Sequence, residues 1–207
     1  MIRFLTFSAF VVFLLSSCRS YQYLDAVGVR PENAKEVNTF FLDTSTALIY
    51  RAKVEAFSKP INGSVFLKTV SPQEHRVAFV NDFGQTLFDI SIFSDGHKSH
   101  FIAPELAKKS MQETLADIFR IITERRFANA ALIFKDKQHY PVYIAGDSYY
   151  KLKRNVVDNI VTVRGGREQL VVDFNSPKDA IPEQIEVQHK KYPLKVNLIF
   201  ERYDQSK

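Results

Sequence analysis

The sequence predicts a mainly β protein of the α+β class, in which a curved antiparallel sheet of about ten or eleven strands forms an incomplete β-barrel. Two observations predict this fold. Apolar and polar residues alternate with a period of two in most segments after residue 39, and short clusters rich in Pro, Gly, Asn and Asp separate them. Residues 104–126 instead have the helical period, which predicts one long amphipathic helix as a lid or plug. Open sheets of this size usually curl.

The first 18 residues have the order of a secretory signal peptide. Arg3 precedes an apolar run over residues 4–15, and the small residues Ser16 and Ser17 follow it. Cleavage at this point would make Cys18, the only cysteine of the chain, the first residue of the mature protein. The segment resembles the lipobox of bacterial lipoproteins, which implies a lipoprotein signal peptide over residues 1–17 and a lipid anchor on Cys18.

Two other interpretations of this segment are weaker. A transmembrane helix over residues 4–15 would be about 18 Å long, well short of the roughly 30 Å hydrocarbon core of a bilayer. An ordinary cleaved signal peptide would leave Cys18 as a free thiol with no disulfide partner. Residue 19 is Arg, not the Asp that favours inner-membrane retention in enteric-type bacteria. We therefore expect a protein that is lipid-anchored in the outer membrane and faces the periplasm.

The rest of the chain suits one domain. Residues 18–38 are polar and predict a lipidated tether, and residues 39–207 are enough for a single domain with a sizeable core. The formal net charge is +5 and no run of five like charges occurs, so the sequence does not favour nucleic-acid binding. The 18 phenylalanines fill a thick core or line an aromatic cavity, and the core is the usual home of such residues.

Short turns separate the predicted strands, so each strand should pair antiparallel with the next. A first group lies before the helix and a second group after it. The predicted strands are residues 47–57, 64–70, 75–80, 86–93 and 97–102, then 131–134, 141–145, 149–153, 159–164, 169–174, 183–189 and 194–203.

The predicted helix begins at Pro104, which suits a first helical position, and ends with Arg125 and Arg126, which suit the C-terminal end of the helix dipole. We expect its apolar stripe to lie on the concave face of the sheet. The stripe consists of Leu106, Met111, Leu115, Ile118, Phe119 and Ile122.

No motif for catalysis, a metal or a cofactor stands out, so we expect a protein that is not an enzyme. His97 and His100 are three residues apart on a predicted strand, and this spacing sends them to opposite faces. Asp82 and Asp95 lie in turns, where Asp is common. A hydrolase ranks third among the functions, because no nucleophile with its base is evident.

The turn Asn81-Asp82-Phe83-Gly84 is the most informative segment of the domain. Asn81, Asp82 and Gly84 are ordinary turn formers, but Phe83 is a large apolar residue at the tip of a hairpin. Such a tip can fold back onto the domain. Otherwise Phe83 forms a hydrophobic finger that contacts a membrane or a lipid.

The segment from Val80 to Thr86, together with the lipobox and the strand pattern, resembles the LolA/LolB superfamily of lipoprotein localisation proteins, and is closer to the lipid-anchored LolB type. Ile181-Pro182 and the apolar closing strand over residues 194–200 add to the resemblance. It implies a half-barrel with helices as a lid around an apolar cavity for acyl chains. The LolB type has an Asn-Pro-Leu-Gly turn whose exposed Leu passes lipoproteins into the membrane, and Phe83 takes that place. The usual Trp residues are absent here, and the predicted helix is longer and more charged.

Two functions follow as expectations. In the first, the anchored protein receives lipoproteins or other acylated ligands, with a periplasmic carrier protein as a further partner. In the second, it is a structural adaptor that binds another envelope protein. A void large enough for acyl chains favours the first, and a filled barrel favours the second. The candidate lining residues of such a cavity are Phe88, Ile90, Ile92, Leu115, Phe119, Val196, Leu198 and Phe200.

Overall fold

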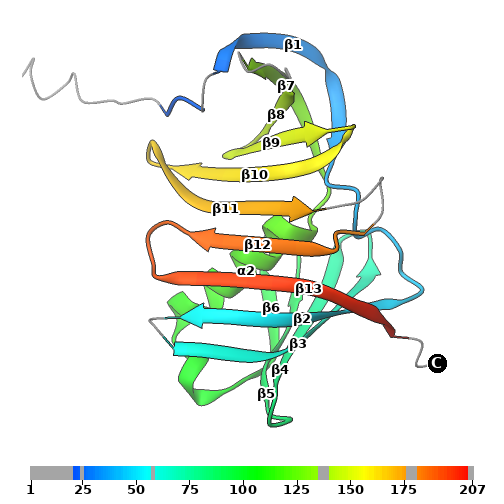
Figure 1. The fold of residues 1–207 in the computed structure, drawn as a ribbon, viewed down its shortest axis with the longest axis vertical. Coiled ribbons are helices and arrows are strands. Elements are labelled where there is room, and N and C mark those ends of the chain that lie inside the picture. Colours follow the sequence, from blue (N-terminus) through cyan, green and yellow to red (C-terminus); the bar gives the residue numbers. More distant parts are fainter. Residues whose placement is uncertain (1–20, 24–25, 57–58, 135–139, 176–180, 205–207) are drawn as a thin grey trace, which may run out of the picture.

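One antiparallel sheet makes up most of the fold (Figure 1). The structure is a computed structural model and describes residues 21–23, 26–56, 59–134, 140–175 and 181–204. A short 3₁₀ helix, η1 (Pro104–Leu106), and one α-helix, α2 (Lys109–Thr123), lie between the sixth and seventh strands. The strands are β1 (Ala26–Val37), β2 (Ala47–Ala56), β3 (Lys59–Ser71), β4 (Glu74–Asn81), β5 (Thr86–Ile92), β6 (His97–Ile102), β7 (Arg126–Phe134), β8 (Pro141–Ala145), β9 (Ser148–Lys153), β10 (Val156–Arg164), β11 (Arg167–Asn175), β12 (Gln184–His189) and β13 (Leu194–Asp204).

Two meanders join to form the sheet. Strands β2 to β6 pair in sequence order, as do β7 to β13, and the C-terminal strand β13 pairs with β2 to connect the two groups. Strand β1 adds to β7 at one edge, and β6 forms the other edge. Within the described part of the chain these two edges do not meet, so the sheet is open. The prediction of a large open antiparallel sheet with one helix is confirmed.

The sheet has 13 strands instead of the ten or eleven expected, and its first strand lies in the predicted tether. Residues 18–38 were expected to be a tether, whereas Ala26–Val37 forms β1 and pairs with β7. The apolar residues Val27 and Val29 of this strand are exposed, at 56% and 62%. Strand β1 lies at an edge of the sheet, and Val37 is the only buried residue among its described side chains, so its sequence lacks the alternation that marks the other strands.

The helix is shorter than predicted. Residues 104–126 were expected to be one helix, but Lys108 is extended (φ −60°, ψ 128°) and separates η1 from α2. At the other end Glu124 is extended (ψ 125°), and Arg126 already pairs with Val37 as the first residue of β7. The pairing of β7 with β1 therefore ends α2 after 15 residues. Among the described residues, no helix combines the length and the apolar character needed to cross a bilayer.

The core lies between α2 and the concave face of the sheet, and Figure 1 shows α2 behind β11 to β13. Ile118, Phe119 and Ile122 of the helix are buried, and the ring of Phe119 lies 5.7 Å from that of Phe88 on β5. Strand residues alternate as the sequence predicts, since Ile185 and Val187 of β12 are buried while Glu186 between them is exposed. One face of the sheet thus forms the core with α2, while most of the other face is exposed to solvent and part of it is covered by residues 21–23.

Two buried side chains hold the chain before β2 against the sheet. Thr69 Oγ1 donates a hydrogen bond to the carbonyl oxygen of Phe41 (3.0 Å), and His75 Nε2 lies 3.2 Å from the same oxygen. Since a carbonyl oxygen only accepts, His75 carries a proton on Nε2. Burial lowers the pKa of His75 below its ordinary value of 6.5. The folded protein therefore holds this ring neutral at pH values where the unfolded chain binds a proton.

We expect the free energy of unfolding to fall as the pH drops below about 6.5, because the unfolded chain then gains a proton that folded His75 does not. The slope from this one residue can reach about 1.4 kcal/mol per pH unit. His189, whose pKa burial also lowers, adds to the effect. Urea denaturation of His75→Gln and the parent at pH 5 to 8 tests this. A parent stability that is flat over this range, or an equal slope in the variant, would contradict it.

Candidate functional site

The turn between β4 and β5 presents one almost fully exposed aromatic side chain. Phe83 is 94% exposed, the largest value among the exposed large apolar residues in the described chain. Asn81 Oδ1 accepts hydrogen bonds from the backbone N–H groups of Phe83 (3.1 Å) and Gln85 (3.0 Å). Gly84 has a positive φ of 78°, which glycine adopts without strain. We call residues 81–85 the finger turn; its tip does not fold back onto the domain.

Two strands on the same side of β4, β2 and β3, support the finger turn. Arg51 on β2 forms a two-point ion pair with Asp82, with N–O distances of 2.6 and 2.8 Å. The backbone N–H of Asp82 donates to the carbonyl oxygen of Asn62 on β3 (3.1 Å). At Gly63 a Cβ atom would come within 2.1 Å of the Val80 carbonyl oxygen, so glycine permits this close approach of β3 and β4. The finger turn is therefore a rigid mount for Phe83, and its supports were missed because they lie 20 to 30 residues away in sequence.

The eight candidate lining residues come together under α2, but they are packed against one another. Six are at most 6% exposed, and Leu115 and Phe200 are half-buried against the same core cluster. The rings of Phe79, Phe88 and Phe119 follow one another at 5.8 and 5.7 Å. A mainly apolar recess near Phe40 and Ile181 measures about 20 Å³, room for about one water molecule. In the described structure these residues form a filled core under the helix.

Polar contacts fasten α2 to both sides of the sheet. Arg120 donates from Nε to the Phe93 carbonyl oxygen (2.9 Å) and from Nη2 to that of Gly96 (3.0 Å). Asp117 accepts from Arg120 (2.6 Å) and, on the other side, from Arg164 of β10 (3.1 Å). These contacts form one polar chain from the β5–β6 turn across α2 to β10. The sequence pattern did not predict this chain, because its members lie in segments that are far apart in the sequence.

Asn38 holds the C-terminal end of α2. Its Nδ2 lies 3.3, 2.9 and 3.0 Å from the carbonyl oxygens of Ile121, Ile122 and Glu124. Asn38 is 1% exposed and has a φ of 60°, in the left-handed region that Asn tolerates better than most residues. Helix C-termini leave such carbonyl groups without partners inside the helix. A residue at the end of β1 thus completes the end of a helix more than 80 residues later.

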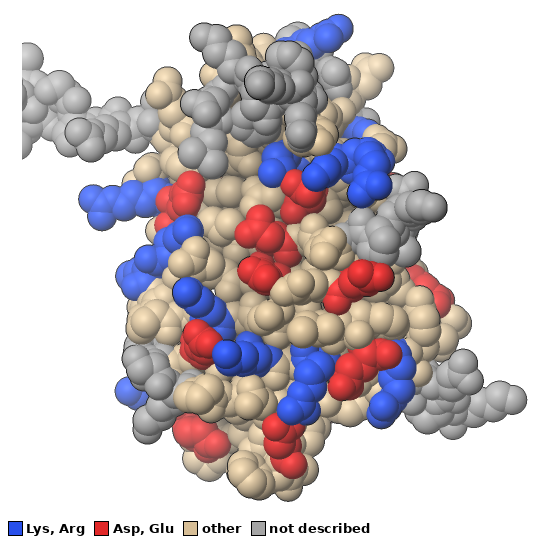
Figure 2. All heavy atoms as spheres, in the orientation of Figure 1, with Lys and Arg blue, Asp and Glu red and all other residues tan. Residues whose placement is uncertain are grey.

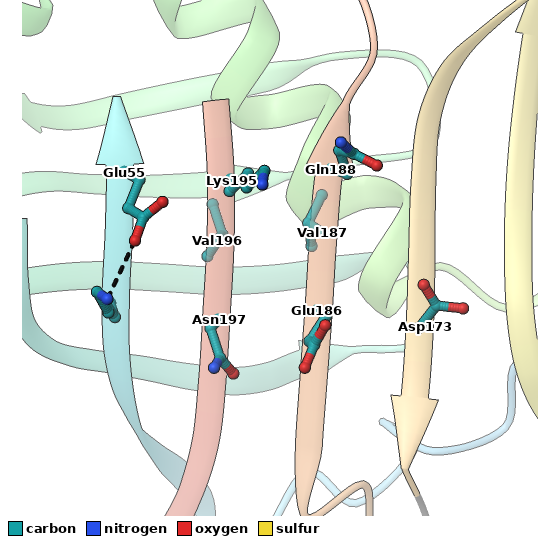
Figure 3. Close-up of a pocket in the computed structure, with 9 residues that line it drawn as sticks. Glu55, Asp173, Glu186, Val187, Gln188, Lys195, Val196 and Asn197 are labelled. Atoms are coloured by element: carbon teal, nitrogen blue, oxygen red, sulfur yellow. Dashed lines mark ion pairs between the residues drawn. The ribbon is translucent and has the colours of Figure 1, made fainter. Parts of the chain in front are cut away.

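The largest hollow that we describe lies on the other face of the sheet, over β2, β11, β12 and β13 (Figure 3). Its volume is about 370 Å³, and its floor is made of charged and amide side chains that point away from α2. Lys53 and Glu55 form an ion pair across one side of it (3.0 Å). Figure 2 shows that acidic and basic side chains alternate over this whole face. Because acyl chains gain nothing from such a lining, this hollow is no candidate for them. The residues around it are Lys53, Glu55, Asp173, Glu186, Val187, Gln188, Lys195, Val196 and Asn197.

The histidines and carboxylates that the sequence singled out do not form a metal centre. His100 Nε2 lies 2.9 Å from Ser91 Oγ, and Asp89 pairs with Arg76, which lowers the pKa of that carboxyl group. Asp82 pairs with Arg51 and so supports the finger turn. Among the described residues, no three His, Cys, Asp or Glu side chains lie close enough to hold a metal ion together.

The chain before β1 is docked on the outer face of the sheet. The ring of Tyr23 stacks on that of Tyr149 (5.0 Å), and its hydroxyl lies 3.1 Å from Asn159 Oδ1. The Tyr21 hydroxyl donates to Glu168 (2.7 Å). Burial, together with this hydrogen bond, raises the pKa of Tyr21. We call residues 21–23 the strap. Cys18 and the signal peptide lie outside the described residues.

Neither a protein-family model nor a curated protein sequence matches the chain. Solved structures with a similar fold include a LolA superfamily protein from Nitrosomonas europaea, with 8% identity, a TM-score of 0.46, and coverage of 81% of this chain and 89% of that one. A DUF1329 family protein from Desulfovibrio piger has 10% identity, a TM-score of 0.46, and coverage of 80% and 88%. A domain described as an outer membrane lipoprotein-sorting protein, from Vibrio parahaemolyticus, has 8% identity, a TM-score of 0.39, and coverage of 78% and 86%.

The LolA superfamily, which the sequence resembles, is thus among the similar folds, while the closer likeness to the LolB type stays a prediction. All three TM-scores are below 0.5 and all three identities are at most 10%. The proposals below therefore rest on the residues of this chain.

Proposed function

We propose that this protein is a lipid-anchored, non-enzymatic receptor of the bacterial envelope, which takes up the acyl chains of lipoproteins or lipids and passes them into the membrane. The observation that carries the proposal is Phe83. A phenylalanine that is 94% exposed, on a turn braced by Arg51 and Asn62, gains no stability from its position in the folded monomer. Insertion into an acyl-chain layer would remove its ring from water and give it a favourable environment.

The acyl site of this proposal is the apolar core between α2 and the concave face of the sheet. Since that space is filled, binding requires α2 to move away from the sheet and the acyl chain to take its place against residues such as Phe88 and Leu198. Burial of acyl surface contributes about 25 cal/mol per Å², which offsets the loss of the contacts that α2 makes. The polar chain through Asp117 and Arg120 would open during this step.

The place of action in this proposal follows from the N-terminal segment. We propose that residues 1–17 are removed, that Cys18 carries the lipid anchor, and that the domain faces the periplasm from the outer membrane. A periplasmic carrier protein would then deliver the acylated cargo, because an anchored receptor cannot collect cargo at another membrane.

The second candidate, a structural adaptor, draws support from the filled core and from the two open sheet edges. Strand β1 carries the exposed residues Val27 and Val29, and β6 carries Phe101, which is 47% exposed. An extended segment of a partner protein could add to either strand by backbone pairing.

Native mass spectrometry of the full chain with Cys18→Ala, purified without detergent and mixed with a diacylated lipopeptide, tests the two candidates. The receptor proposal predicts a complex whose mass exceeds that of the chain by one lipopeptide. The same peptide without acyl groups is the matched control and should not bind. A spectrum that contains only the free chain at lipopeptide concentrations up to the critical micelle concentration would contradict acyl binding and favour the adaptor.

A further inference from the structure

A groove runs between α2 and the ends of strands β10 to β12, on the side of the helix that faces the β12–β13 turn. Its volume is about 200 Å³. We call it the side groove. It borders the apolar core at Leu170, which is 4% exposed.

The two walls of the side groove carry opposite charge. The helix wall consists of Ser110, Glu113, Thr114 and Asp117, whose spacing of three and four residues places them on one face of α2. The sheet wall carries the cations Arg164 from β10 and Lys191 from the β12–β13 turn, together with His189 from β12 and Gln169 from β11. The acidic wall thus faces a basic wall across a space large enough for a small polar group.

At one end of the groove the walls are already joined. Arg164 Nη1 lies 3.1 Å from Asp117, and Arg164 Nε lies 3.1 Å from Asp147. Glu113 and Lys191, which also line the groove, form no ion pair with each other among the described contacts. The contact of Glu113 with Lys109 is long, at 3.9 Å, and the Lys109 side chain is 91% exposed. Lys191 Nζ lies 5.3 Å from the centre of the Tyr192 ring. The groove therefore offers the carboxylate of Glu113 and the ammonium group of Lys191 to a ligand.

His189 lines the groove, and the β12–β13 turn holds its ring. Its Nδ1 accepts hydrogen bonds from the backbone N–H groups of Lys191 (3.1 Å) and Tyr192 (3.0 Å), and its ring lies 4.6 Å from that of Tyr192. Because Nδ1 accepts, the neutral ring carries its proton on Nε2. Burial and the nearby Lys191 lower the pKa of His189, which agrees with a neutral ring. The sheet wall therefore supplies an N–H donor next to the Lys191 ammonium group.

We propose that the side groove binds a zwitterionic phospholipid headgroup, with its ammonium group at Glu113 and its phosphate at Lys191 and His189. Asp117 is not free for the ligand, because Arg120 and Arg164 already pair with its two oxygens. A simple anion would meet Glu113, and a simple cation would meet Lys191, so only a ligand with both charges satisfies both walls. The inference goes beyond the proposed function, since it describes a headgroup site on the closed structure, before α2 moves. It adds a preference for aminophospholipids of the ethanolamine type.

The test uses the headgroup without acyl chains, so that it does not depend on the acyl site. Glycerophosphoethanolamine is titrated into the isotopically labelled chain with Cys18→Ala, and binding is followed by NMR at the side groove and at His189. We expect saturable shifts that glycerophosphoglycerol, inorganic phosphate and ethanolamine do not produce at equal concentration. We expect Glu113→Gln and Lys191→Gln each to weaken binding about tenfold, the loss of one charge-assisted hydrogen bond.

The matched control variants are Glu105→Gln and Lys68→Gln, which change the same charges at exposed positions outside the groove. They should leave the affinity unchanged. The proposal is overturned if glycerophosphoethanolamine gives no saturable shift, if inorganic phosphate shifts the same residues equally, or if all four variants bind alike. A lipopeptide complex in native mass spectrometry together with any of these results would overturn the headgroup site and leave the receptor proposal intact.

Discussion

Replacing Phe83 with glutamate is expected to abolish the transfer of lipoprotein into membranes while the domain stays folded. The carboxylate cannot enter the acyl-chain layer, because a charged group there costs several kcal/mol. Since the parent side chain is 94% exposed, the change in unfolding free energy should stay within about 0.5 kcal/mol. The measurement is the transfer of a labelled lipoprotein from a soluble carrier to liposomes that contain the lipidated protein, together with a thermal melt.

Phe83→Leu is the matched control, because it keeps an apolar side chain of similar reach on the same turn. We expect it to retain most of the transfer rate. Equal transfer by Phe83→Glu and the parent would exclude the finger from the mechanism. Loss of transfer in both variants would mean that the aromatic ring has a role other than apolar insertion.

Replacing Asn38 with aspartate is expected to destabilise the fold and to release the C-terminal end of α2. Aspartate has nearly the same shape and tolerates the left-handed backbone at φ 60°, but it sets acceptor oxygens against the carbonyl groups of Ile121, Ile122 and Glu124. We expect a loss of about 2 to 3 kcal/mol, the usual effect of leaving buried polar groups without partners. Urea denaturation measures the loss.

Hydrogen exchange locates the effect of the same change. In Asn38→Asp, amide exchange should accelerate in the last turn of α2 more than in the strands of the second meander, because only the helix end loses its donor. Asn38→Gly is the control, since it keeps the backbone conformation and lets water reach the carbonyl groups, so its loss should be smaller. A uniform acceleration over the whole sheet would show that Asn38 stabilises the fold as a whole and not the helix end.

Alternation of apolar and polar residues predicted most of the sheet, because each such strand buries one face under α2. The strand over residues 184–189 is an example, with Ile185 and Val187 inward and Glu186 and Gln188 outward. Strand β1 could not be predicted in this way, since Val37 is the only buried residue among its described side chains and the others are exposed or half-buried. The end of α2 was also beyond prediction, because the partner of its carbonyl groups, Asn38, is remote in sequence.

The residue types of the turn predicted the tip of the candidate site, Phe83. The contacts that support the turn come from residues remote in sequence and were not predicted. Phe83 stands out in sequence because its neighbours Asn81 and Gly84 need no explanation beyond the turn. Arg51 gives no such signal, since an arginine on a strand is usually solvated. The stripe of apolar residues on α2 and β5 identified the face that packs, but an apolar residue in a core and one in a cavity wall have the same sequence pattern.

The docked strap limits how the domain can stand on a membrane. Tyr21 is fixed on β9 to β11 by Tyr149 and Glu168, and only two residues lie between it and Cys18, a reach of about 10 Å. Five strands lie between β10 and β4 in the sheet, which corresponds to about 29 Å at the usual strand spacing. Figure 1 shows the strap near the top of the molecule and the β4–β5 turn at the bottom.

If Cys18 carries the proposed lipid anchor, the anchor and the ring of Phe83 reach the same leaflet only when the long axis of the domain lies flat along the bilayer. An upright domain would instead hold Phe83 out in the periplasm, where an arriving carrier would meet it first. With the strap in place, a change between these two postures needs no rearrangement of the sheet. Tilting the domain about the short segment between Cys18 and Tyr21 would move Phe83 from the periplasm, where it could receive cargo, to the bilayer, where it could deliver cargo.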